Sequence, residues 1–200
     1  MTKQTDNEAF ARRIQAWLSI PVDGWAGENT VKAFNARVGL VEETAQGNRI
    51  PDSYFTLLSK IESGDRPYIK APTSSGSGLY QFIRSTWLGE GGRWGSDMSK
   101  AFGGLTPPVS EQTERARSFT QKNADALQRA GIPVNNASLY AIHFLGAGTA
   151  IKALRGALTD PIADHVDDGA IAANPTILGV GKTVKDFIDW LERKTGVRAK

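Results

Sequence analysis

Apolar residues recur at helical spacing along the first forty residues of the chain. The spacing predicts a helix over residues 8–18 and, after a turn over residues 20–27, a second helix that starts at Asn29 or Thr30 and ends at Gly39. Proline and glycine in the turn interrupt the apolar pattern between the two helices. The apolar faces consist of Ala9, Ile14, Trp17, Leu18, Val31, Ala33, Phe34 and Val38.

From Pro51 onward the apolar spacing is again mostly helical, and no alternating run is long enough for a major sheet. Two segments rich in Gly and Ser are expected to be irregular: residues 64–80, a loop or irregular hairpin, and residues 89–104, a loop. Ser53 and Asn136 are expected to cap helices. The expected helices cover residues 53–63, 81–88, 110–130, 137–145, 149–157, 161–166 and 182–195. The predicted fold class is therefore mainly α.

The same pattern predicts how the chain divides into domains. Residues 1–41 form a small helical module, the polar stretch 42–50 is a linker, and residues 51–200 form a larger helical domain. Forty residues bury little apolar surface, so we expect the module to be stabilised by its neighbour.

Composition excludes several classes of protein. The 200 residues are 40% hydrophobic and 22% charged, which is typical of a globular domain and not of a disordered chain, a collagen-like repeat or a coiled coil. A formal charge of only +3 gives no reason to expect a nucleic-acid partner. The absence of cysteine excludes a disulfide scaffold, a thiolate metal site and a cysteine nucleophile.

Neither a metal nor another cofactor is expected. The two histidines, His143 and His165, have no partner at the spacing of a zinc site. Gly179–Thr183 matches only the end of a phosphate-binding loop, because Thr176 stands where that motif needs its first glycine.

The first residues are polar and mixed in charge, so they lack the basic-then-apolar order of a secretory signal peptide. No stretch approaches the roughly 20 apolar residues of a membrane-spanning helix. We therefore expect a monomer that is made in the cytoplasm without a signal peptide, does not insert into a membrane, and needs a separate export route to act outside.

Glu62 is the strongest candidate for chemistry. It falls on the last turn of an expected apolar helix, where the negative end of the helix dipole and partial burial would both raise the pKa of a carboxyl group. A carboxyl group that stays protonated near neutrality can act as a general acid on a leaving oxygen. The alternative is a solvated surface charge, which is the usual role of a glutamate at a helix end.

The segment that follows Glu62 contains groups suited to binding a polysaccharide. Gly76 and Gly78 allow close approach of a ligand to the backbone, and Gln81 offers both a donor and an acceptor. Ser74 and Ser75 add hydroxyl groups. Four aromatic rings could stack on sugars: Tyr80, Phe82, Trp87 and Trp94. The alternative is an ordinary core beside a Ser/Gly loop, and the composition of the segment leaves both interpretations open.

Taken together, these residues resemble the soluble lytic transglycosylase domain of the goose-type lysozyme clan. Glu62-Ser63-Gly64 is followed by Gly78-Leu79-Tyr80-Gln81, which is similar to the family's Glu-Ser and Gly-Leu-Met-Gln blocks with Tyr in place of Met. Leu139–Gly146 resembles the helix in which the family carries Ala-Tyr-Asn-Ala-Gly along the cleft. The resemblance covers residues 53–191.

The resemblance implies a lysozyme-like helical domain that cleaves the β-1,4 bond between N-acetylmuramic acid and N-acetylglucosamine in peptidoglycan. Glu62 matches the single catalytic acid/base. Gln81, Ser74 and Ser75 match the cleft wall that binds acetamido groups. His143 stands where the family often has a tyrosine that contacts substrate, so it is either a substrate contact or a core histidine.

A second resemblance covers the N-terminal residues. Asp23-Gly24-Trp25-Ala26-Gly27, then Thr30 and Ala33-Phe34, is similar to the motif of peptidoglycan-binding domain 1. Asp23 and Gly24 suit a tight turn, with Gly24 at positive φ and Asp23 bonded to local backbone. The resemblance implies a small wall-binding module, in which Trp25 is the candidate contact.

Two mechanisms are open on this scaffold. A hydrolysing muramidase needs a second carboxylate or a positioned water, with the two carboxyl groups roughly 5 Å apart for retention and about 6.5–9.5 Å apart for inversion. A lytic transglycosylase needs only Glu62, which protonates the leaving oxygen and then deprotonates the C6 hydroxyl to form a 1,6-anhydro ring. Asp65, Glu90 and Asp97 are the candidate second carboxylates, and we favour the route with one glutamate.

These inferences predict a peptidoglycan lytic transglycosylase. The alternatives are a muramidase, a chitin hydrolase, and a non-catalytic wall-binding or phage-tail structural module. One wall-binding module joined to one glycosidase domain, without a signal peptide, is typical of phage endolysins and virion-associated enzymes. Holin-type release, virion delivery or a bacterial secretion machine would bring it to the cell wall.

Overall fold

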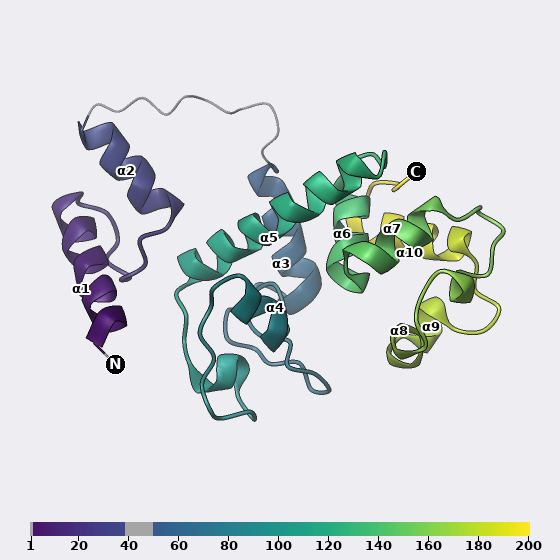
Figure 1. The fold of residues 1–200 in the computed structure, drawn as a ribbon, viewed down its shortest axis with the longest axis horizontal. Helices are drawn as coiled ribbons and strands as arrows, with labels where there is room; N and C mark the ends of the chain where they lie inside the picture. Colours follow the sequence, from purple (N-terminus) through teal and green to yellow (C-terminus); the bar gives the residue numbers. More distant parts are fainter. Residues whose placement is uncertain (1, 39–49) are drawn as a thin grey trace. The chain divides into compact units, whose positions relative to one another are not determined.

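The computed structural model describes residues 2–38 and 50–200, and these residues are mainly helical, as predicted (Figure 1). No sheet forms within this part of the chain, and its β pairing is limited to the isolated bridges Lys70–Ser77, Ser77–Phe82 and Pro161–Thr183. The α-helices are α1 (Thr2–Trp17), α2 (Glu28–Val38), α3 (Asp52–Ser63), α4 (Arg84–Gly89), α5 (Val109–Arg129), α6 (Asn136–Leu145), α7 (Ala147–Arg155), α8 (Asp168–Ala173), α9 (Pro175–Leu178) and α10 (Val184–Thr195). Two 3₁₀ helices are η1 (Ala101–Gly104) and η2 (Ile162–Asp164).

The chain forms two compact units, residues 1–118 and residues 119–200, and the boundary falls inside α5. The predicted linker, residues 42–50, and the predicted stop at Gly39 lie almost wholly outside the described residues. The predicted division into a module and a domain therefore stays a prediction.

A single buried side chain, Gln15 of α1, organises the turn between α1 and α2. Its amide nitrogen donates to Asp23 Oδ1 at 2.6 Å and to the carbonyl oxygen of Trp25 at 2.9 Å, and its amide oxygen accepts from the backbone N–H of Gly24 at 2.9 Å. Gly24 has a φ of 80°, which the turn requires and which only glycine adopts easily. The geometry of this turn is thus fixed by hydrogen bonds from α1, and the residues of the Asp-Gly motif are structural.

Two caps differ from the prediction by one or two residues. Pro51, and not Ser53, precedes the first residue of α3, because its φ of −68° and ψ of 149° give the extended conformation in which a helix can begin. Asn135, and not Asn136, caps α6: its side chain accepts from the N–H groups of Ala137 and Ser138, and Ser138 completes a capping box. Both helices bury apolar residues, among them Tyr54 and Leu58 of α3 and Leu139 and Ile142 of α6.

Further differences concern short helices. α4 begins at Arg84, three residues later than expected, and η2 replaces the helix expected over residues 161–166. α8 and α9 were not predicted, since α8 buries none of its residues and α9 is a single turn that begins with Pro175. Such helices carry too little apolar periodicity to be found from a pattern.

Each unit has its own buried cluster. In the first unit Trp87 packs between Phe82 and Phe102, with ring centroids 5.8 and 4.7 Å away. In the second unit α6 packs against α7 and α10. Thr183 caps the N-terminus of α10. The fully buried residues of that cluster include Ala137, Ile142, Ala150, Val184, Phe187, Ile188 and Leu191. No helix among the described residues is long and apolar enough to cross a membrane.

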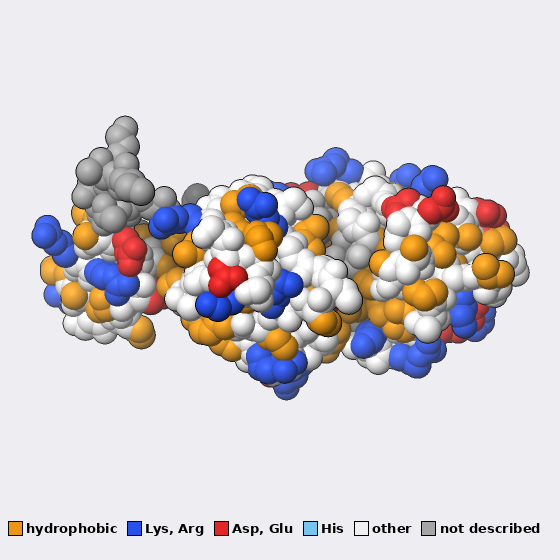
Figure 2. All heavy atoms as spheres, turned by 90° about the horizontal axis from the view of Figure 1, so that it is seen from below, with side chains coloured by type: hydrophobic (Ala, Val, Ile, Leu, Met, Phe, Trp, Pro, Cys, Tyr) orange, Lys and Arg blue, Asp and Glu red, His pale blue; other side chains and the backbone are white. Residues whose placement is uncertain are grey.

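The surface is mixed in charge. On the face shown in Figure 2, Lys and Arg side chains are interspersed with Asp and Glu side chains and with apolar ones. This distribution agrees with the small net charge of +3.

Candidate functional site

Glu62 occupies the last turn of α3 and is partly buried. The helix ends directly after it because Gly64 adopts the left-handed conformation, with a φ of 61°, and its N–H donates to the carbonyl oxygen of Lys60 at 3.3 Å. Ser63 is held by a hydrogen bond from its hydroxyl to the carbonyl oxygen of Ser59 at 3.1 Å. Glu62 is therefore carried on a hydrogen-bonded helix end and not on a loop.

Tyr54, one of the largest fully buried side chains, lies on the same helix as Glu62. Burial raises the pKa of the Tyr54 phenol far above its ordinary value, and the negative charge of Glu62 raises it further. The carboxylate of Glu62 thus lies close enough to this buried phenol for the two groups to interact. A phenol that keeps its proton at any physiological pH gives Glu62 a neighbour that cannot become negatively charged.

The loop between α3 and α4 is held mainly by backbone hydrogen bonds. Ala71 N–H donates to Gly76 O at 2.8 Å, and Gly78 N–H donates to Ile69 O at 2.9 Å. Gln81, at a φ of 48°, donates from its amide to Gly78 O at 3.0 Å. The predicted irregular hairpin is present, and Gln81 braces it from inside.

Ser74 and Ser75 have structural partners in this loop. The Ser74 hydroxyl accepts from the N–H of Gly76 at 3.0 Å. The Ser75 hydroxyl accepts from the N–H of Arg84, the first residue of α4, at 3.0 Å. Both hydroxyl groups therefore accept hydrogen bonds from backbone N–H groups, one in the loop and one at the start of α4. Whether they also bind acetamido groups stays a prediction.

The aromatic residues predicted to stack on sugar are mostly core residues, which corrects that prediction. Trp87 is fully buried and donates from Nε1 to Arg93 O at 2.8 Å. Phe82 is 3% exposed, and Tyr80 is 4% exposed with its hydroxyl 3.1 Å from Thr113 Oγ1. Burial removes the free ring faces that stacking requires, because Trp87 packs on both Phe82 and Phe102. Trp94 is partly buried against Phe102 at 5.8 Å.

The three candidate second carboxylates each have local partners. Asp97 accepts from the Ser99 hydroxyl at 2.5 Å and pairs with Lys100 at 3.1 Å, and the hydrogen bonds from Ser99 and Lys100 lower its pKa. Asp65 accepts from the Ser59 hydroxyl at 2.5 Å. Glu90 accepts from the Ser118 hydroxyl at 2.9 Å. Asp97 is thus a turn residue that shapes the loop before η1, and nothing in its contacts indicates a role in catalysis.

His143 lies on α6 in the second unit and is partly buried. Its ring stacks on Tyr140, with centroids 6.3 Å apart and planes 14° apart, and it forms an edge-on pair with Phe119, with centroids 6.3 Å apart and planes 77° apart. Tyr140 stacks in turn on Trp190 at 5.7 Å. The ring therefore belongs to an aromatic row, as a packed histidine would, and whether it also contacts substrate stays a prediction.

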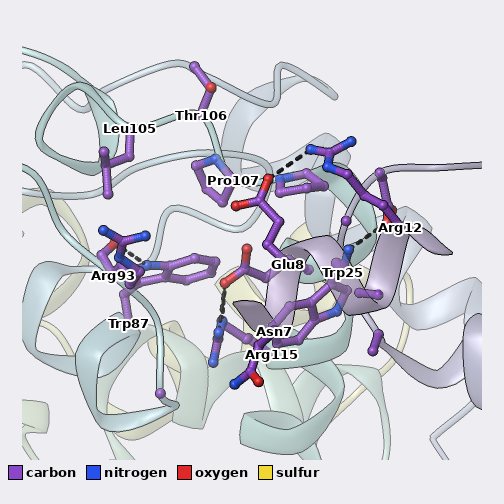
Figure 3. Close-up of a pocket in the computed structure, with 17 residues that line it drawn as sticks. Asn7, Glu8, Arg12, Trp25, Trp87, Arg93, Leu105, Thr106, Pro107 and Arg115 are labelled. Atoms are coloured by element: carbon purple, nitrogen blue, oxygen red, sulfur yellow. Dashed lines mark hydrogen bonds and ion pairs between the residues drawn. The ribbon is translucent and has the colours of Figure 1, made fainter. Parts of the chain in front are cut away.

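A pocket of about 760 Å³ lies in the first unit, and the sequence did not predict it (Figure 3). Its lining contains none of Glu62, Ser74, Ser75 or Gln81. It brings together Trp25 and Trp87, which were assigned to different sites from the sequence, on either side of Arg115. The Arg115 guanidinium lies 4.7 Å from the ring centroid of Trp25 and 5.1 Å from that of Trp87. Sequence reasoning missed Arg115 because an arginine inside a long amphipathic helix carries no signal of its own.

Gln112, one turn earlier on α5, was also missed. It is 1% exposed, and its amide oxygen accepts from the N–H of Leu79 at 2.9 Å, while its amide nitrogen donates to Pro67 O at 3.0 Å and Pro107 O at 3.1 Å. Gln112 therefore ties both arms of the loop that follows Glu62 to α5.

No protein-family model matches the chain. The two resemblances described above consequently rest on their quoted residues. Among the described residues, no group of three or more His, Asp or Glu side chains is arranged to hold a metal ion.

Proposed function

We propose that the protein cleaves the β-1,4 glycosidic bond between N-acetylmuramic acid and N-acetylglucosamine in peptidoglycan, with Glu62 as the single acid/base. The observation that carries the proposal is the position of Glu62. It is a partly buried carboxyl group on the last turn of α3, close to the buried phenol of Tyr54. A carboxyl group in such surroundings can donate a proton and then accept one.

The proposed reaction uses Glu62 twice. Its carboxyl proton moves to the bridging oxygen as the bond from C1 of the muramoyl residue to that oxygen breaks. The C6 hydroxyl of the same residue then attacks C1 and gives its proton to the Glu62 carboxylate. A 1,6-anhydromuramoyl end forms, no water is consumed, and the enzyme returns to its starting state.

The contacts of the other carboxylates favour this route over hydrolysis. Asp65, Glu90 and Asp97 accept hydrogen bonds from Ser59, Ser118 and Ser99 respectively, so each already has a structural role. A retaining or inverting hydrolase would need one of them opposite Glu62. Hydrolysis through a water held by other groups remains the alternative that the product analysis below separates.

The decisive experiment digests purified peptidoglycan with the wild-type chain and with Glu62→Gln, which keeps the size of the side chain and removes its proton chemistry. We expect soluble muropeptides from the wild type alone, with muramoyl ends lighter by one water in the mass spectrum. Intact reducing ends would show hydrolysis. Equal release by both proteins would remove Glu62 from the mechanism, and no release by either would support a non-catalytic wall-binding or tail module.

Substrate and site of action follow from the same proposal. Peptidoglycan is the partner, and the cell wall is the place where the protein acts, reached by holin-type release, by a virion or by a secretion machine. A parallel digest of chitin oligomers tests the chitin-hydrolase alternative, because a chitin hydrolase would cleave these oligomers, whereas an enzyme that needs a muramoyl residue would not.

A further inference from the structure

Tyr68 is the one exposed aromatic residue among residues 51–118, all of which the structure describes. The other aromatic residues of this range are buried or partly buried, namely Tyr54, Phe55, Tyr80, Phe82, Trp87, Trp94 and Phe102. Tyr68 is 47% exposed, and its side chain has neither a ring partner nor a hydrogen-bond partner among the described residues. Single exposed apolar residues are common on protein surfaces, so the surroundings of Tyr68 decide what it can do.

The backbone is held in place on both sides of Tyr68. The carbonyl oxygen of Pro67 accepts from Nε2 of Gln112 at 3.0 Å, and the carbonyl oxygen of Ile69 accepts from the N–H of Gly78 at 2.9 Å. Gln112 is 1% exposed, so the first of these bonds ties the segment to the interior of the first unit. A tyrosine on a fixed backbone loses only the freedom of two side-chain torsions when a ligand covers it, which lowers the entropic cost of binding.

Gln81, which the sequence predicts as a ligand of an acetamido group, lies beside this segment. Its Nε2 donates to Gly78 O at 3.0 Å and lies 3.4 Å from the carbonyl oxygen of Ile69, the residue that follows Tyr68. Its amide oxygen lies close to Gly76, since a Cβ built there would be 3.0 Å from it. The loop therefore brings a polar amide to within one residue of the exposed ring.

Glu62 is also near Tyr68 along the chain. Six residues span at most about 20 Å when they are fully extended. The chain here is folded back, because Gly64 and Asp65 both have a φ of 61° and the N–H of Asp65 donates to Ser59 O at 3.3 Å. A glycan strand of several sugars can therefore reach from the carboxyl group of Glu62 to the ring of Tyr68.

The chemistry of the segment favours a neutral ligand with one apolar face. The cation next in the chain, Lys70, is used by the loop itself, because its ammonium group donates to Ala71 O at 3.0 Å and to Ser74 O at 2.9 Å. An aromatic ring offers a flat apolar face, on which the C–H groups of a sugar ring can pack. An N-acetylhexosamine supplies this face together with an amide that a neighbouring glutamine can bind.

We propose that Tyr68 is a substrate-binding residue whose ring packs on an N-acetylhexosamine of the glycan strand, in the subsite beside Gln81. The choice of a sugar rests on the proposed function. The choice of Tyr68 rests on its exposure, its fixed backbone and its closeness to Gln81. Tyr68 thus takes the stacking role that the sequence assigned to Tyr80, Phe82 and Trp87, which are buried.

Isothermal titration tests this role with a tetrasaccharide of alternating N-acetylglucosamine and N-acetylmuramic acid as the probe. The full-length Glu62→Gln chain is the parent protein, so that the probe is bound without being cleaved. Adding Tyr68→Ala should weaken binding about tenfold, because the stacking ring is lost, whereas Tyr68→Phe keeps the ring and should bind within about twofold of the parent. Unchanged affinity of Tyr68→Ala, equal losses in the two variants, or no saturable binding by the parent at millimolar concentration would overturn the proposal.

Phe10→Ala is the matched control. Phe10 is another exposed ring, 64% exposed on α1, and it lies outside the loop between α3 and α4. Its loss should leave binding of the tetrasaccharide within about twofold of the parent. Equal weakening by Phe10→Ala and Tyr68→Ala would refute the assignment, because any exposed ring would then have the same effect. Thermal unfolding confirms that each variant is folded.

Kinetics with an intact Glu62 separate this proposal from the proposed function. Tyr68→Ala should raise KM for soluble glycan strands several-fold and change kcat little, since a stacking contact binds substrate and transition state alike. Cleavage by the wild type with the same KM and tetrasaccharide affinity in Tyr68→Ala overturns the role of Tyr68 and leaves that of Glu62 intact. Binding that depends on Tyr68, without cleavage by the wild type, supports the sugar subsite and removes the enzymatic proposal.

Discussion

Replacement of Gln112 by leucine tests how the loop that follows Glu62 is held in place. Gln112 lies on α5, is 1% exposed, and is the only side chain of the described residues that bonds to Leu79, Pro67 and Pro107 at once. Leucine has nearly the same volume and a high helix propensity, so Gln112→Leu keeps α5 and its packing while it removes both polar atoms.

The expected loss in the free energy of unfolding follows from the polar groups that lose their hydrogen-bond partner. The variant leaves one backbone N–H, that of Leu79, and two carbonyl oxygens, those of Pro67 and Pro107, without their partner. A buried polar group that loses its partner costs about 1–3 kcal/mol, so if water reaches one of the three groups the other two amount to about 2–6 kcal/mol. Such a loss is a large part of the total stability of about 5–15 kcal/mol of an ordinary domain.

Urea denaturation followed by tryptophan fluorescence measures this loss, with Gln121→Leu as the control. Gln121 lies on the same helix and makes one hydrogen bond, 3.1 Å, to Asp125 on the next turn. The control should lose about 0.5 kcal/mol or less. If Gln112→Leu were no less stable than Gln121→Leu, the buried hydrogen bonds of Gln112 would not hold the loop and the reasoning would be refuted.

Three further outcomes are expected. Burial alone would raise the pKa of Asp23, but hydrogen bonds from Ser110, Gln15 and the Trp25 N–H outweigh burial and lower the pKa below 3.8. The stability that Asp23 contributes is therefore present at pH 7 and is lost as the pH falls through the lowered pKa. The difference in melting temperature between the wild type and Asp23→Asn should accordingly shrink in acid. Gly78→Ala should lower the melting temperature by several degrees, since Gly78 has a φ of 77° and a Cβ there would overlap Gln112 and Phe102; an unchanged melting temperature would contradict this. Asp97→Asn should leave the rate of peptidoglycan cleavage within about twofold, and a loss of a hundredfold or more, typical of a missing acid or base, would revive the hydrolytic alternative.

A helix could be predicted where the residues that specify it are close together in the sequence. α3 and α10 were found nearly to the residue, because three or more apolar residues recur on one face within a few turns and Gly64 and Gly196 mark the ends. The tight turn at Asp23-Gly24 was also predicted from a local signal, which is the Asp-Gly pair itself. The caps at Pro51 and Asn135 were misplaced by one or two residues, since neighbouring residues of the chain could have served and only the backbone angles distinguish them.

Some residues of the candidate site could likewise be assigned from neighbouring residues, and others could not. Glu62 could be assigned to a helix end from the sequence, because the apolar run before it and the glycine after it are both local signals. Whether an aromatic ring faces solvent or the core is not local: Trp87 packs on Phe102, which is 15 residues further along the chain, and Phe82 packs on Trp87. Their assignment to a sugar-binding wall was wrong for that reason.

The sequence by itself determined the helical class, the positions of the longer helices and the carboxyl group at the end of α3. Only the tertiary structure decided that Gln112 bonds to loops 33 and 45 residues away, and that Trp25 and Trp87 enclose Arg115. Helix formation depends on hydrogen bonds between residues four apart, which the spacing of side chains reveals. Pockets and buried polar contacts depend on which distant segments pack together, and the pattern along the chain carries no record of that.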